Sequence, residues 1–208
     1  QVRTYGHLAA HEAIHATLHH VGTEPFDVYK REHFGYASLQ FVAMASEQVE
    51  EHLAEYLSSQ VVSSGSTTSE LVDQAFGAFV DALDVQLPAV PEDDPDYFGK
   101  GMLITFEALH ILWKTLVYLA AELRLADGFE QVPDEIERLE VWQRAVAQWW
   151  DEYIGLLGEI PMSTDISIAA TDEVVKQLGL HLQQWALGIG FDFHDTDDDD
   201  GGWFQILY

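Results

Sequence analysis

The most apolar stretch of the chain runs from Leu103 to Ala121 and reads LITFEALHILWKTLVYLAA. It carries Glu107, His110 and Lys114, which a membrane-spanning segment would have to bring into lipid. These three polar residues share one face of an otherwise apolar helix. The stretch therefore predicts a helix buried inside a protein, in which the polar side chains need partners.

Helical periodicity extends through most of the chain and predicts a mainly α-helical fold, with a single domain over residues 1–208. Strands are expected to be short and peripheral, in VVSS, in residues 165–169 or in the terminal WFQILY. Thr67, with Glu70 at capping-box spacing, is expected to start the third helix, and Thr171 to cap the sixth. About six helices are expected, over roughly Thr4 to His20, His33 to Ser58, Thr67 to Leu83, Met102 to Arg124, Pro133 to Gly158 and Thr171 to Gly188.

The chain is extremely acidic, with 36 Asp and Glu against 9 Lys and Arg and a formal net charge of −27. Such a surface repels nucleic acid and anionic membranes, so neither is expected as a partner. Its self-repulsion should weaken the folded state at low salt and largely vanish at molar salt. The composition therefore predicts a cytoplasmic protein of a halophile that accumulates salt.

The acidic segment over residues 192–202 contains the run DTDDDDGG. Its spacing does not fit a calcium-binding EF-hand loop, because Thr196 and Leu207 stand where the first aspartate and the bidentate glutamate are needed. The segment is therefore interpreted as a solvated charge run.

Residues 7–20, HLAAHEAIHATLHH, hold half of the ten histidines and contain the motif HExxH as His11, Glu12 and His15. Two histidines four positions apart lie on one face of a helix, so both rings can reach one cation. Glu12 lies about 100° around the helix, where a carboxylate can hold a metal-bound water and act as general base. The chain has no cysteine, so thiolate ligands are excluded. Residues 1–58 are thus expected to carry a metal site.

The histidine pattern is longer than the motif, because His7 and His19 continue it at every fourth position. One zinc ion needs only two of these four side chains. His7 and His19 therefore have three possible roles: groups that orient the ligands, ligands of a second metal ion, or exposed residues that titrate near neutral pH.

Downstream stands EQVEEHLAEYL, from Glu47 to Leu57. Together with HEAIHATLHH it resembles the gluzincin metallopeptidases of the ImmA/IrrE type, in which a helix of the form Exx(A)(D/N)xFAxxL follows HExxH. The resemblance covers about a quarter of the chain. It implies a zinc-dependent hydrolase acting on peptides, with His11, His15 and Glu47 as zinc ligands and Glu12 as the general base.

The residues themselves leave the third ligand open. Glu50 lies at the margin of the apolar face of its helix, and Glu51 shares the face of Glu47. HEAIHA also resembles the HEAxHA of membrane-bound AAA proteases, whose third ligand stands further along the chain. On that pattern, Glu70 or Asp73 would take the place of Glu47.

Two other functions stay open. Glu12 with His15, and Glu107 with His110, are both ExxH pairs, the spacing that ferritin-like di-iron bundles use. That alternative predicts iron in place of zinc. The third possibility is a helical scaffold or partner-binding protein without catalytic activity, with its six tryptophans in a core or an interface.

Overall fold

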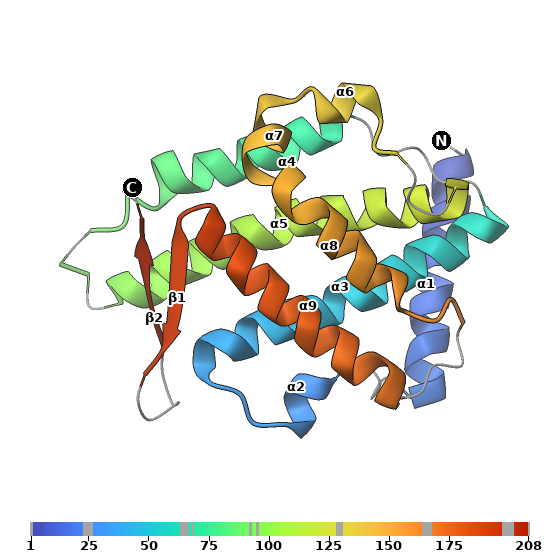
Figure 1. Cartoon of the computed structure of the whole chain (residues 1–208), viewed down its shortest axis with the longest axis horizontal. Coiled ribbons are helices and arrows are strands. Elements are labelled where there is room, and N and C mark those ends of the chain that lie inside the picture. The colour runs from blue at the N-terminus through green and yellow to red at the C-terminus, as the bar shows by residue number, and fades with distance from the viewer. Residues whose placement is uncertain are drawn as a thin grey trace.

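A computed structural model of the chain describes residues 2–22, 27–62, 67, 69–91, 93–94, 96–127, 131–163, 168–196 and 202–207 (Figure 1). The apolar stretch lies within α5 (Tyr97–Asp127), which crosses the middle of the molecule. Leu109, Trp113 and Leu116 of this helix are fully buried, as predicted. Among the described residues, one helical span, Gly99–Ala126, is long and apolar enough to cross a membrane, and half of its most apolar window is buried within the fold. Buried core helices share that property.

The helix α3 (Tyr36–Val61) is the hub of the fold. It packs against α5, against α9 (Ile168–Gly188) and against α1 (Val2–Gly22). The short α2 (Val28–Arg31) lies between α1 and α3 in sequence and also packs on α3. Because α3 has neighbours on several sides, apolar and polar residues alike are buried along it, among them Phe41, Gln48 and Leu53.

One close approach in the bundle depends on a glycine. A Cβ placed on Gly179 of α9 would lie 3.1 Å from the Cα of Val42 and 3.2 Å from its backbone nitrogen. A larger residue there would have to push α9 away from α3, because backbone atoms cannot move aside as a side-chain tip does.

The helix α4 (Ser69–Asp81) and the π-helical turn η1 (Ala82–Gln86) pack against α5. The expected role of Thr67 as the cap of this segment is wrong, because α4 begins two residues later. Thr67 instead donates its backbone N–H and its hydroxyl to the carboxylate of Glu122 on α5, at 2.8 to 2.9 Å. Thr171 is likewise no cap, since α9 already starts at Ile168, whose carbonyl accepts the Thr171 hydroxyl.

The fifth expected helix is broken into α6 (Asp134–Glu137), α7 (Glu140–Ala145) and α8 (Ala147–Gly158). Leu139 is extended, with φ −63° and ψ 130°, and separates the first two. Ile136 and Trp142 are both buried in the core. On one continuous helix their side chains would point about 120° apart, so the break allows both to face inward.

The side chain of Arg124 joins α5 to the end of α8. Its guanidinium donates to the carbonyl oxygens of Leu157, Gly158 and Ile160 at 2.8 to 3.0 Å. Helices end with carbonyls that have no partner inside the helix. Arg124 supplies donors for them, and a lysine could not match this fork of N–H groups.

Two strands, β1 (Phe191–Asp195) and β2 (Gly202–Ile206), form an antiparallel hairpin with Phe191 paired to Ile206. The expected short strand in WFQILY is thus confirmed in its described part. Of the other two segments, VVSS begins with Val61, the last residue of α3, and its final two residues lie outside the described residues. The segment 165–169 enters α9 at Ile168. No strand is found in the described part of either segment.

The acidic segment is partly structural. Asp195 accepts a hydrogen bond from the backbone N–H of Ala37 at 2.5 Å and one from the hydroxyl of Ser38 at 3.1 Å. Gly35, the residue that precedes α3, has no side chain with which to cap the helix. Asp195 therefore caps α3 from another part of the chain, and only residues beyond it remain candidates for a solvated run.

Candidate metal centre

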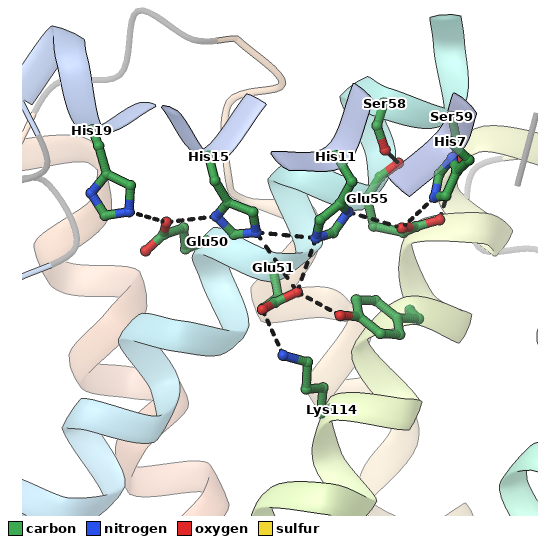
Figure 2. A network of polar contacts seen from close by, with 11 residues as sticks. His7, His11, His15, His19, Glu50, Glu51, Glu55, Ser58, Ser59 and Lys114 are labelled. Atoms are coloured by element: carbon green, nitrogen blue, oxygen red, sulfur yellow. Dashed lines mark hydrogen bonds and ion pairs between the residues drawn. The ribbon is translucent and has the colours of Figure 1, made fainter. Parts of the chain in front are cut away.

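The histidines of α1 face the carboxylates of α3 (Figure 2). His7, His11, His15 and His19 form one row along α1, and Glu50, Glu51 and Glu55 of α3 lie opposite. The small residues Ala9, Ala13 and Ala16 do not lie at this contact, since all three are exposed. The packing face of α1 is therefore largely polar.

The centre of this row brings His11, His15 and Glu51 together. The Nε2 atoms of the two histidines are 3.0 Å apart, and Glu51 Oε2 lies 3.3 Å from His11 Nε2 and 3.9 Å from His15 Nε2. A tetrahedral zinc ion with bonds of about 2.1 Å would place its ligand atoms about 3.4 Å apart. The three distances bracket that value, so this group could hold a metal ion.

The outer nitrogens of the same two rings contact other glutamates. His11 Nδ1 lies 3.2 Å from Glu55 Oε2, and His15 Nδ1 lies 2.8 Å from Glu50 Oε1. A histidine that binds a metal through one nitrogen commonly donates the N–H of the other to a carboxylate, which fixes the ring and its tautomer. Both histidines have such an acceptor at the correct nitrogen.

Two side chains of α5 hold Glu51. Lys114 Nζ donates to Oε1 at 2.8 Å, and the Tyr118 hydroxyl donates to Oε2 at 2.7 Å. Burial by itself would raise the pKa of Glu51, but its hydrogen-bond donors lower that pKa to about 2. Burial and the adjacent carboxylate raise the pKa of the Tyr118 phenol well above its usual value. Glu51 is thus ionised, and Tyr118 keeps its proton.

His11 is the most perturbed histidine of the row. Burial disfavours its charged form, but Glu51 and Glu55 outweigh burial and raise the pKa of His11 to about 9. The pKa of Glu55 is lowered, because its hydrogen bonds with His11 and His7 outweigh the effect of burial. In the metal-free protein His11 therefore carries a positive charge at neutral pH.

The two ends of the row differ in exposure. At one end His7 Nε2 lies 3.0 Å from Glu55 Oε2, and the His7 side chain is 15% exposed. At the other end His19 Nε2 lies 3.0 Å from Glu50 Oε1, but the His19 side chain is 56% exposed. A hollow of about 470 Å³ adjoins this second end and is lined in part by His19, Glu47 and Glu50.

The structure does not place Glu47 beside His11 and His15. Glu47 belongs to none of the possible metal-binding groups among the described residues, is 45% exposed, and lies 3.5 Å from His110 Nδ1. Glu51, one helical turn further along and one of the candidates that the sequence left open, lies beside the two histidines instead of Glu47, the ligand that the resemblance implied. Glu70 and Asp73 lie on α4 and are exposed.

Glu12 is exposed and also belongs to none of these groups. A general base is not itself a metal ligand, so the role of Glu12 as the base stays a prediction. The two ExxH pairs do not converge either, because Glu107 is exposed and His110 contacts Glu47. Lys114, which the sequence showed to need a partner, pairs with Glu51 of α3.

Comparisons of the chain with protein-family models, curated proteins and solved structures found no match. The resemblance to the gluzincins therefore stays a prediction, carried by the motif and the helix that follows it.

Proposed function

We propose that the protein binds one divalent transition-metal ion through His11 Nε2, His15 Nε2 and Glu51 Oε2. The observation that carries this proposal is the pair of contacts on the far side of the two rings. Glu55 and Glu50 accept from the two Nδ1 atoms, which leaves both Nε2 lone pairs directed at Glu51. A cluster of histidines formed by chance would not need a carboxylate acceptor at the outer nitrogen of each ring.

Zinc is the ion that this ligand set suits best. Two imidazole nitrogens and one carboxylate oxygen form the protein ligand set of several zinc enzymes, and the chain has no thiolate to offer. Magnesium and calcium prefer sites built from oxygen. Copper and nickel also bind imidazole well, so the metal supply of the cell also determines which ion occupies the site.

We infer metal-dependent hydrolysis as the reaction class. Catalytic zinc sites have three protein ligands and keep a fourth position for water, whose pKa the metal lowers. Lys114 holds Oε1 of Glu51 at 2.8 Å, which favours coordination through Oε2 alone and leaves room for that water. Glu12 stays the predicted base that accepts a proton from that water.

Metal content tests the proposal directly. Protein dialysed against metal-free buffer after zinc loading should retain one zinc per chain by elemental analysis. His11→Ala should retain less than about a tenth of that amount, because His11 contributes to the buried centre from both nitrogens. Glu51→Gln should weaken zinc binding by more than about tenfold.

Three variants on the same helices are the matched controls. Glu47→Gln tests the ligand expected from the spacing, Glu12→Gln the expected base, and His20→Ala an exposed histidine of α1. All three should bind zinc as the unchanged protein does, and Glu12→Gln should lose hydrolysis of ester or amide substrates if Glu12 acts as the base. Equal zinc loss in Glu47→Gln and Glu51→Gln would contradict the ligand set.

Zinc binding should depend on pH through His11. Because the pKa of His11 is about 9 without metal, zinc must displace one proton below that pH. The apparent affinity should therefore rise about tenfold per pH unit up to pH ~9 and then level off. Calorimetry in two buffers of different ionisation enthalpy should find about one proton released per zinc at pH 7.5. Glu55→Gln removes one of the charges that raise this pKa, so its proton release should be smaller.

A further inference from the structure

The orientation of His7 indicates where its proton lies. His7 Nδ1 is 3.0 Å from the backbone carbonyl oxygen of Val62, which can only accept. The proton therefore sits on Nδ1, and in neutral His7 the lone pair is on Nε2. That lone pair faces Glu55 Oε2 at 3.0 Å. A carboxylate oxygen at this distance from Nε2 requires a positive charge between the two atoms, which is either a proton on Nε2 of a charged His7 or a metal ion bound to both.

A third ligand atom lies at the same place. His11 Nδ1 is 3.2 Å from the same Glu55 oxygen, and the ligand atoms of His7, His11 and Glu55 all lie within 4.8 Å of one another. Ser59 donates its hydroxyl to the other oxygen of Glu55 at 3.1 Å. Each end of the group is therefore oriented by a neighbour, His7 by Val62 and Glu55 by Ser59.

We propose that His7 Nε2, His11 Nδ1 and Glu55 Oε2 form a second site for a divalent transition-metal ion. Like the first site, it offers two imidazole nitrogens and one carboxylate oxygen, so it suits the same class of ion. Its side chains are also well shielded from water, with Glu55 8% exposed. The group formed by His15, His19 and Glu50 is weaker, because the exposed His19 stays in water.

The two sites share His11 but use different nitrogens of its ring. A neutral imidazole has one lone pair and one N–H, so it can bind a metal through only one nitrogen at a time. When His11 Nε2 binds at the first site, Nδ1 donates to Glu55; when Nδ1 binds at the second, Nε2 donates to Glu51. The ion at one site therefore excludes the ion at the other, and the chain holds one ion in two alternative positions.

Variants that remove one site and leave the other test this exchange. His15→Ala removes a ligand of the first site and of the weaker exposed group, and it leaves the second site intact. The His7→Ala/His19→Ala double variant removes the second site and the weaker group, and it leaves the first site intact. By equilibrium dialysis against zinc, each should bind one ion, as should the unchanged protein. His7→Ala/His15→Ala should bind none, and His20→Ala should bind one.

The outcomes separate this inference from the first metal centre. Loss of all zinc in His15→Ala would overturn the second site. Two zinc ions on the His19→Ala single variant, which lacks the weaker group, would overturn the exchange, because His11 would then bridge them. Loss of zinc in His7→Ala/His19→Ala with retention in His15→Ala would instead overturn the first centre and leave the second. Circular dichroism of each variant shows that it has folded, so that an empty site is not mistaken for an unfolded chain.

Discussion

Removing the metal should release α1 from the rest of the protein and lower the thermal unfolding midpoint by about 10 °C. Among the α1 side chains that the structure describes, over residues 5–20, Leu18 is the one buried apolar side chain, while Tyr5 and Leu8 are largely exposed. The helix is held mainly by its histidines. An ion at 1,000 times its dissociation constant stabilises the folded state by about 4 kcal/mol. In a chain of this size, each kcal/mol shifts the midpoint by about 2–4 °C.

Hydrogen exchange and thermal unfolding, each with and without a chelator, measure this effect. Protection should fall in α1 and persist in α5, which is surrounded by apolar core. Zinc should restore both the protection and the midpoint, whereas magnesium should not, because it prefers oxygen ligands. Equal protection of α1 in the two states would show that the metal does not hold this helix.

Without metal, the α1–α3 contact should also weaken at alkaline pH. The pKa of His11 in the folded protein is about 9, above the ordinary histidine value of 6.5. A raised pKa of this kind stabilises the folded state fully below pH 6.5, and that stabilisation is lost as the pH rises through about 9. Chelated protein should therefore lose α1 protection further between these two pH values.

Stability should rise strongly with salt. At a net charge of −27, exposed carboxylates repel one another over a Debye length of about 10 Å at 0.1 M salt, but over only about 3 Å at 1 M. Unfolding spreads these charges apart, so low salt favours the unfolded chain. Raising potassium chloride from 0.1 M to 2 M should increase the unfolding midpoint by roughly 10 °C, which corresponds to about 3 kcal/mol.

A charge-reduced variant separates screening from other effects of salt. Asp73, Asp151 and Glu159 are exposed and lie on or beside α4 and α8. Their replacement by Asn, Asn and Gln should raise stability at 0.1 M salt and reduce the rise between 0.1 M and 2 M. A variant with the same salt dependence as the unchanged protein would show that repulsion among surface carboxylates is not the cause. The halophilic origin predicted from composition would then lose its physical basis.

The sequence predicted the class of fold and the helix that carries the histidines, because both depend on local periodicity. His11 and His15 are adjacent on a helix wherever that helix packs, so their pairing follows from a spacing of four. The breaks around Leu139 and Val146 were missed, because proline and glycine are not what interrupts the helix there. Ile136 lies before the break at Leu139 and Trp142 after it, and both are buried. Their burial depends on how the segment packs against the rest of the fold, which local periodicity does not show.

The third ligand depended on where two helices cross. Figure 1 shows α1 crossing α3 steeply, toward the carboxy-terminal half of α3, so that only a short part of α3 meets the histidines. Glu47 and Glu51 stand on one face, and their sequence environment does not show which of them lies at the crossing. A signal was present in the repeated spacing of Glu47, Glu51 and Glu55, which matches the repeat of the histidines. It could not fix the register of one helix against the other.

The contact between Asp195 and the start of α3 has a consequence for how the protein can be engineered. The hairpin holds one end of α3 at Ala37. The carboxylates that face α1, Glu51 and Glu55, lie about 21 to 27 Å further along this helix of 26 residues. A deletion that removes the hairpin would leave the backbone amide of Ala37 and the hydroxyl of Ser38 without their acceptor, at a distance from the histidines of α1. Loosening the first turn of α3 would then reach the ligands only through the helix itself. Chains that lack the hairpin would thus show whether loss of order at the first turn of α3 spreads along this helix to the metal ligands.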